Sequence, residues 1–337
     1  MTTTYDDDAL TPLTRMRKVV HISDVHITNS NKPRITEFFS LIASYYQNSE
    51  TKPILIITGD ICEGDNISSV QSAVESSYEI QTSVARKIFG KMRSLGFEIC
   101  ICPGNHDYPP NGDLNNIRMT YICDNFIKGF YNITGKLSYP IVRSSGKYIF
   151  FILDSNAGEF EGAKKEFWDG SLGDVQLGLL RKKLVKVGKG QVVFILLHHH
   201  PLSPAPLCLL SDSKKLMKVI RDSNNEADNS VIVAFGHLHK SARKFTKRKY
   251  GVKLAISSQS STAASRCKHF NFIEIIPNVD KDTPDLLTHV QAKIKGEYFE
   301  DVTEDSEYEI IKKGNVPNKR GYLPSERCAQ FFFCGCF

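Results

Sequence analysis

Five short clusters of Asp, His, Asn and Gly carry most of the side chains in this sequence that could do chemistry. Each cluster directly follows an apolar run, and the candidate metal ligands within them are Asp24, His26, Asp60, Asn105, His199, His237 and His239. They comprise two carboxylates, one amide oxygen and four imidazoles, without a thiolate. A mixed nitrogen and oxygen set suits Zn, Mn, Fe or Ni. The residue types therefore predict a metal site.

The size of this ligand set predicts two ions rather than one. Seven ligands exceed the number that one tetrahedral ion takes, whereas two ions accommodate them if one carboxylate bridges. Two divalent ions about 3.5–4 Å apart favour in-line displacement at phosphorus, because they stabilise the attacking and leaving oxygens together. His106 and Asp107 directly follow Asn105. A His beside an ion pair can protonate a leaving alkoxide, and a neighbouring carboxylate can fix its tautomer.

The elements that must position these clusters are strands and helices of an α/β fold. The apolar runs that lead into the clusters cover 18–22, 54–58, 97–103, 192–197 and 231–235, and they are predicted to be buried strands. Helical periodicity covers 34–46, 69–95 and 174–187. Ligands of open α/β sheets bind beyond the carboxyl ends of the strands, where all five clusters fall. Apolar runs at 252–256, 270–276 and 286–294 predict a β-meander that closes a second sheet.

The five clusters, in this order, resemble the calcineurin-like metallophosphoesterase superfamily. The matching motifs are Asp24-x-His26, Gly59-Asp60, Gly104-Asn105-His106-Asp107, His199-His200-Pro201 and Gly236-His237-x-His239, which span about two thirds of the chain. Leu153-Asp154-Ser155 is also similar to a segment that many members carry before the fourth motif. The resemblance implies a four-layer α/β/β/α sandwich, in which two mixed sheets are flanked by helices and a dinuclear centre lies at the strand ends.

The resemblance also implies a role for each motif. One ion is expected to be held by Asp24, His26, Asp60 and His239, and the other by Asp60, Asn105, His199 and His237, with Asp60 bridging. His106 is expected to be the leaving-group acid, supported by Asp107. Three consecutive histidines precede Pro201, and alignment on His-His-Pro favours His199 as the ligand. His198 and His200 are then expected to point to the opposite face or to support the ligands.

The implied activity is hydrolysis of a phosphate ester by in-line attack of a metal-bound hydroxide, with Mn, Fe or Zn as cofactors. The domain size and the Gly-Asn-His-Asp motif are similar to small bacterial-type phosphodiesterases that act on cyclic nucleotides or related diesters, which slightly favours a diester substrate. The alternatives are a phosphomonoesterase or protein phosphatase, a nuclease, and a scaffold without activity. Every ligand position is filled, which argues against a scaffold. The net charge of +6 without an aromatic-studded basic groove disfavours nucleic acid.

Composition and chain ends set the expected organisation of the 337 residues, of which 41% are hydrophobic and 24% charged. We expect a polar segment 1–16, a catalytic domain 17–296 and a C-terminal extension 297–337. Nine cysteines without a Cys-x-x-Cys pair and an acidic N-terminus without a signal region predict a cytoplasmic protein, with Cys100 and Cys102 as small buried thiols. The end Cys334-Gly335-Cys336-Phe337 has the length of a prenylation box. Lipidation there would attach the protein to a membrane; the alternative is a tail that packs on the domain.

Overall fold

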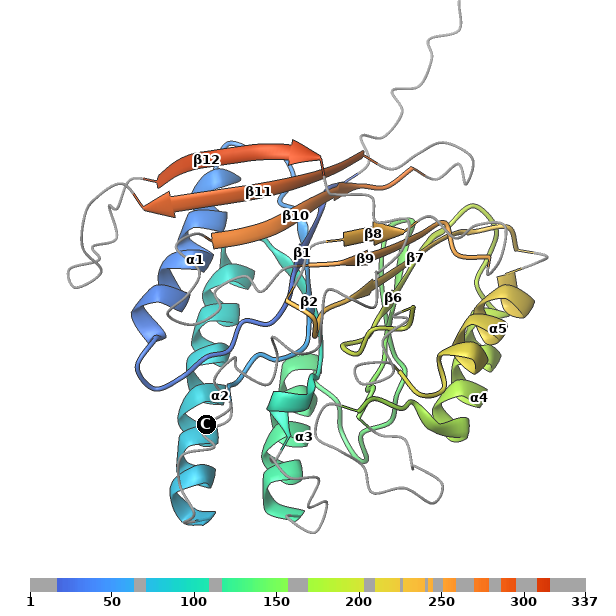
Figure 1. The fold of residues 1–337 in the computed structure, drawn as a ribbon, viewed down its shortest axis with the longest axis horizontal. Coiled ribbons are helices and arrows are strands. Elements are labelled where there is room, and N and C mark those ends of the chain that lie inside the picture. Colours follow the sequence, from blue (N-terminus) through green and yellow to red (C-terminus); the bar gives the residue numbers. More distant parts are fainter. Residues whose placement is uncertain are drawn as a thin grey trace, which may run out of the picture.

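Figure 1 shows the fold of the protein in a computed structural model. The structure describes residues 17–63, 71–108, 117–156, 169–202, 210–224, 227–239, 242–244, 251–258, 270–278, 286–294 and 308–315. The expected N-terminal segment 1–16 and the expected lipidation sites Cys334 and Cys336 lie outside these residues.

The first of two mixed sheets has the strand order β12-β11-β10-β1-β2-β3. Strands β1 (Val19–Ile22), β2 (Ile54–Thr58) and β3 (Glu98–Cys102) are parallel to one another. Strands β10 (Phe270–Ile276), β11 (Leu286–Ile294) and β12 (Tyr308–Asn315) form an antiparallel meander that pairs with β1. All residues of β1 and β2 are buried, as expected for apolar strands that are covered on both faces.

The second sheet has the order β4-β5-β6-β7-β9-β8. Its parallel centre consists of β5 (Tyr148–Ile152), β6 (Val192–Leu196), β7 (Ser230–Phe235) and β9 (Leu254–Ser257). The edge strands β4 (Ile141–Ser145) and β8 (Ala242–Lys244) run antiparallel to their neighbours. The two sheets pack face to face, and a continuous core of buried residues from both fills the space between them.

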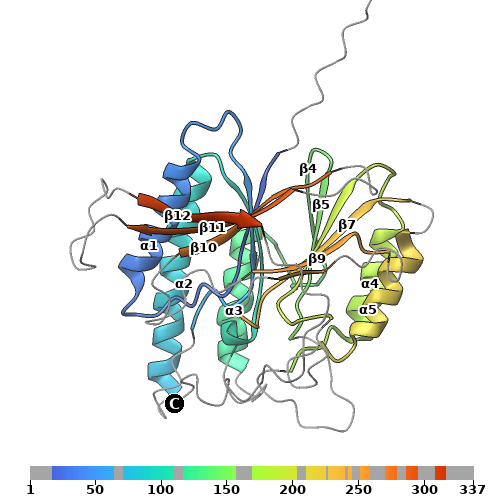
Figure 2. The same cartoon turned by 45° about the horizontal axis from the view of Figure 1, so that its top comes forward.

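Helices cover the outer face of each sheet. Helices α1 (Lys32–Tyr45), α2 (Gln71–Ser94) and α3 (Ile117–Tyr131) lie on the side of the first sheet, and α4 (Gly173–Leu184) and α5 (Ser213–Asn224) on the side of the second (Figures 1 and 2). A second core cluster lies between α4, α5 and the second sheet. The expected sandwich of two mixed sheets flanked by helices is therefore confirmed.

The strands after residue 240 differ from the prediction. Only β9, together with the short β8, joins the second sheet, whereas the meander β10-β11-β12 extends the first. The reason is that β2 pairs with only one edge of β1, so the other edge is open to pairing with β10. Strand β12 lies within the expected C-terminal extension and is hydrogen-bonded to β11, so part of that extension belongs to the first sheet.

Two further features concern membranes and thiols. Among the helices that the structure describes, none combines the length and the apolar character needed to cross a bilayer. Cys62, Cys100, Cys102 and Cys123 are buried free thiols, as expected for Cys100 and Cys102.

Candidate metal centre

The candidate ligands lie on short turns at the carboxyl ends of the strands, and most of these turns have unusual backbone. Asp24, His26, Asp60, His237 and His239 all have positive φ angles, of 52°, 51°, 50°, 72° and 49°. Left-handed backbone costs roughly 1–2 kcal/mol per non-glycine residue and persists only where surrounding contacts enforce it. Its concentration at these five residues marks the turns as a functional site rather than as ordinary connections.

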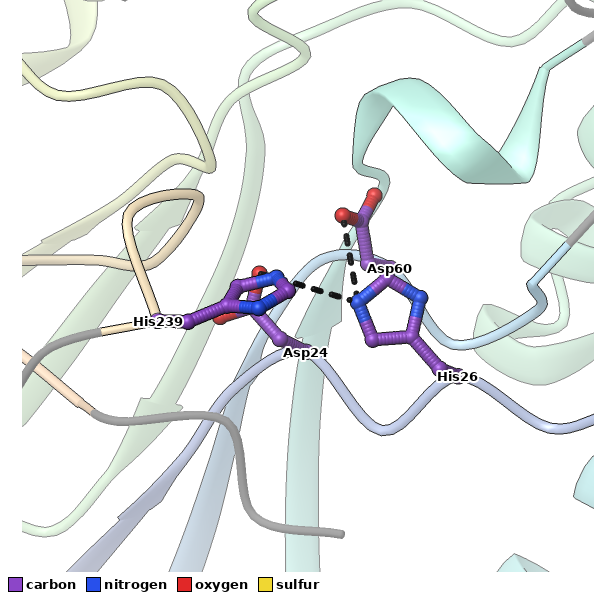
Figure 3. A group of neighbouring side chains, drawn as sticks. All are labelled: Asp24, His26, Asp60 and His239. Atoms are coloured by element: carbon purple, nitrogen blue, oxygen red, sulfur yellow. Dashed lines mark hydrogen bonds and ion pairs between the residues drawn. The ribbon is translucent and has the colours of Figure 1, made fainter. Parts of the chain in front are cut away.

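The first group of ligand atoms comes from the turns that follow β1, β2 and β7. The ligand atoms of Asp24, His26, Asp60 and His239 all lie within 4.8 Å of one another (Figure 3). Nε2 of His239 is 3.2 Å from Nε2 of His26 and 3.2 Å from Oδ1 of Asp24, and Nε2 of His26 is 3.8 Å from Oδ2 of Asp60. This group contains every residue that the resemblance implied for one ion.

A second group shares Asp60 with the first. Nε2 of His198 is 3.2 Å from Oδ2 of Asp60 and 2.9 Å from Oδ1 of Asn105. Nδ1 of His237 is 3.1 Å from Oδ1 of Asn105 and 3.1 Å from Nε2 of His198. Asp60 thus borders both groups, which is the position that a bridging carboxylate requires.

Of the histidine triplet, in which His199 is the expected ligand, His198 directs Nε2 at Asp60 and Asn105 of this centre. Nδ1 of His198 donates a hydrogen bond to the Thr58 carbonyl at 2.8 Å. The proton is therefore on Nδ1, and the lone pair of Nε2 points at Asp60 and Asn105. An outer partner that fixes the tautomer in this way is typical of metal-ligating histidines.

Ser155 contacts both the backbone and the ring of the expected ligand His199. Oγ of Ser155 accepts the backbone N–H groups of His198 and His199, at 3.4 and 3.2 Å, and lies 2.7 Å from Nδ1 of His199. Two acceptor positions are then filled, so the hydroxyl hydrogen is donated to Nδ1 of His199. Ser155 is thus the partner of Nδ1 of His199, the ring nitrogen on the side away from Nε2.

The chemistry of the assembled donor set fits metal ions. His26 also carries its proton on Nδ1, because that atom lies 2.7 Å from the carboxylate of Glu63. At His198, a ring nitrogen, a carboxylate and an amide oxygen face one another, and such a set can bind either a proton or a metal ion. Burial disfavours a proton on His198, but Asp60 and Asp24 outweigh burial and raise the pKa of His198 to about 9. The same negative field attracts a divalent ion, which competes with that proton.

Two glycines allow the chain to approach the carboxylates. A Cβ atom on Gly104 would collide with the carboxylate and backbone nitrogen of Asp60. A Cβ on Gly236 would collide with the Ser23 hydroxyl and would lie 2.7 Å from Oδ2 of Asp24. Neither glycine has a positive φ, so close approach, rather than backbone freedom, is the reason for glycine at both positions.

His106 and Asp107 occupy the loop beside the first group, but they do not interact as expected. Nδ1 of His106 donates to the backbone carbonyl of Glu63 at 2.7 Å, and its ring packs edge-on against His26 with the centroids 5.0 Å apart. The carboxylate of Asp107 instead accepts the N–H groups of Gly104 and Cys62, both at 2.8 Å. The tautomer of His106 is therefore set by Glu63, and Asp107 holds the loop in shape.

The residues of the centre differ in their exposure to solvent. Asp24 and Asp60 are buried, whereas the side chain of His239 is 40% exposed and that of Glu63 is 34% exposed. Among the described residues, His239 and Glu63 therefore connect the centre to the solvent.

The comparison with known families agrees with this geometry. The model of calcineurin-like phosphoesterases matches residues 17–241 of the chain. The chain belongs to this family. It is accordingly a metal-dependent phosphoesterase, a hydrolase of ester bonds, and the expected family and enzyme class are confirmed.

Individual relatives are remote. A search of curated proteins finds no match. Among solved structures, the chain is similar to GAP50, the anchor in the inner membrane complex of Plasmodium, with a TM-score of 0.47, 11% identity and 94% of each chain covered. It is also similar to the cold-active protein-tyrosine phosphatase of a psychrophilic Shewanella species, with a TM-score of 0.31, 12% identity, and 81% of this chain and 80% of the other covered.

The sequence did not single out several residues that support the centre. Thr58 orients His198, and Glu63 contacts both His26 and His106. No spacing of these residues along the sequence indicates the contacts. Ser155 falls in the Leu153-Asp154-Ser155 segment noted from the resemblance, but only the structure reveals its bond to His199.

Proposed function

We propose that the protein is a dinuclear metal-dependent phosphodiesterase. The observation that carries the proposal is the convergence of two ligand groups on the shared carboxylate of Asp60, with Oδ2 of Asp60 3.8 Å from Nε2 of His26 and 3.2 Å from Nε2 of His198. The preference for a diester rests on the similarity of the Gly-Asn-His-Asp motif and the domain size to small bacterial-type phosphodiesterases. A phosphorylated small molecule is the proposed substrate class.

In this proposal the chain supplies two sets of ligands and one acid. The first ion would be held by Asp24, His26, Asp60 and His239, and the second by Asp60, Asn105, His198 and His237. Nitrogen and oxygen donors without a thiolate suit Mn, Fe or Zn. When bound, such ions activate water as a nucleophile and neutralise charge on the phosphate oxygens.

His106 is the proposed acid for the leaving group. Its Nδ1–H is held by the Glu63 carbonyl at 2.7 Å, so Nε2 is the ring atom available to pass a proton to the departing oxygen. The backbone N–H of His106 donates to Oδ1 of Asp60 at 2.9 Å, which ties the acid to the bridging carboxylate.

The test is a substrate screen with Mn²⁺ or Zn²⁺ added, comparing alkyl and aryl phosphodiesters with the corresponding monoesters and with an oligonucleotide. Faster turnover of diesters supports the proposal, and turnover of monoesters or of the oligonucleotide alone replaces it with a phosphatase or a nuclease. A His106→Ala variant is expected to lose about 10²–10⁴-fold on an alkyl diester but far less on an aryl diester, whose leaving group needs little protonation. Equal losses on both substrates would contradict the acid role.

A further inference from the structure

We propose that Glu63 is a positioning residue that serves both halves of the reaction, through its carboxylate at one ion and through its backbone carbonyl at the acid. The proposal rests on the proposed function. The carboxylate lies 2.7 Å from Nδ1 of His26, and the carbonyl lies 2.7 Å from Nδ1 of His106. One residue thus contacts Nδ1 of two histidines whose rings pack edge-on against each other beside the first ligand group.

The backbone of Glu63 is held in place without help from its side chain. Its N–H donates to the Ile27 carbonyl at 3.0 Å, and the N–H of Ile27 donates to the Ile61 carbonyl at 2.8 Å. These bonds continue the parallel pairing of β1 and β2 beyond the strand ends. On the other side, the N–H of Cys62 donates to the carboxylate of Asp107. The segment is therefore fixed from both flanks, and a substitution at Glu63 leaves the carbonyl where it is.

The carboxylate acts on one ligand group only. The negative carboxylate 2.7 Å from Nδ1 of His26 favours a proton on that nitrogen, and Nε2 then faces Asp60 and His239. A carboxylate behind a ligating imidazole also makes the ring a stronger donor, and loss of such a partner typically lowers metal affinity about 10–100-fold. His26 belongs to the first group and not to the second, whose outer partner is the Thr58 carbonyl on His198. Removing the carboxylate should therefore weaken one ion and spare the other.

The carbonyl acts on the acid. Because Nδ1 of His106 donates to a main-chain oxygen, the orientation of this ring does not depend on which side chain residue 63 carries. The two functions of Glu63 are thus separable by mutation. Replacement of the side chain should alter metal binding but leave the pH dependence contributed by His106 unchanged.

The experiment titrates Mn²⁺ into the metal-free full-length protein by calorimetry, for wild type, Glu63→Ala and Glu63→Gln, with Glu79→Gln as control. Glu79 is an exposed residue of α2 that belongs to neither ligand group, so its substitution removes the same charge without removing a contact to a proposed ligand. Wild type and the control are expected to bind two ions per chain. Glu63→Ala is expected to bind one ion as wild type does and the other about 10–100-fold more weakly. Glu63→Gln, which keeps the volume and an accepting oxygen, should lose less.

The outcomes separate this inference from the proposed function. If wild type binds no Mn²⁺, the proposed function fails. If wild type binds two ions and both Glu63 variants bind them with unchanged affinity, the positioning role is overturned although the function stands. Equal weakening of both ions in Glu63→Gln, at an unchanged melting temperature of the metal-free protein, would likewise overturn it. A shift of the pH profile in Glu63→Gln, measured on an alkyl diester at saturating Mn²⁺, would refute the separation of the two roles.

Discussion

Exchange of His198 or His199 for alanine provides the sharpest test of the assigned centre, because the two residues are adjacent in sequence and differ in what they face. His198 directs Nε2 at Asp60 and Asn105, 3.2 and 2.9 Å away. His199 is bonded through Nδ1 to Ser155 at 2.7 Å. Both rings are buried, so a difference in metal binding between the variants cannot come from exposure.

The expected magnitudes follow from these contacts. A residue that only orients a ligand is worth about 10–100-fold in affinity, so loss of a ligand itself should cost at least about 100-fold, or about 2.8 kcal/mol, at the second ion. His199→Ala removes one hydrogen bond and leaves a cavity, which should lower the free energy of unfolding by about 3 kcal/mol. Its effect on ion affinity should stay within about threefold, since the partner of Nδ1 of His199 is Ser155 and His198 is the assigned ligand.

The assay is Mn²⁺ titration by calorimetry combined with chemical unfolding of the metal-free variants. His198→Ala is expected to bind one ion tightly and the second weakly, and His199→Ala is expected to bind two ions but unfold at lower denaturant. The reasoning is refuted if His199→Ala loses the second ion while His198→Ala keeps it. That result would restore the ligand expected from the His-His-Pro alignment.

Three other perturbations have defined outcomes. Gly104→Ala should abolish binding of two ions, measured by calorimetry, because its Cβ collides with Asp60. Gly90→Ala in α2 is the control, since a Cβ there meets nothing within 4 Å. Thermal melts of this control should show a fold stabilised by about 0.5–1 kcal/mol. Burial raises the pKa of Glu37 to about 7, although the charge of Arg34 opposes this shift. The protonated carboxyl therefore contributes its full stability below pH 4.5, the pKa of Glu37 in the unfolded chain. This contribution is lost as the pH rises through about 7. Glu37→Gln should therefore raise the melting temperature at about pH 8 but hardly at about pH 4; an equal rise at both would contradict the assignment. Mn²⁺ at about 100 times its dissociation constant should add about 2.7 kcal/mol of stability for each bound ion, and a chelator should reverse this gain. Identical melting curves with Mn²⁺ and with chelator would show that the folded chain binds no ion.

The strand ends, the order of the motifs and most of the ligand set could be predicted because each is encoded locally. An apolar, β-branched run such as 192–197 specifies a buried strand, and the polar turn after it places side chains at the carboxyl end. Helices α1, α2 and α4 lie within a few residues of the predicted ranges for the same reason. The assignment of β9 to the second sheet is confirmed, but that of β10 and β11 was wrong, because pairing of β10 with β1 joins residues about 250 positions apart and no local pattern encodes it.

The sequence by itself determined which kinds of donor this protein offers and that they gather at one edge of the sheets, since residue type and strand pattern are properties of short segments. Only the tertiary structure decided how those donors are used. Which of three consecutive histidines faces the centre depends on Thr58 and Ser155, which lie 140 and 44 residues from the rings that they orient. For the same reason, the partner of the His106 ring is the backbone carbonyl of Glu63, whereas the sequence predicted the neighbouring Asp107. The protonated nitrogen of a histidine ring is the one that faces a hydrogen-bond acceptor. The fold decides which acceptor that is, and adjacency along the chain does not.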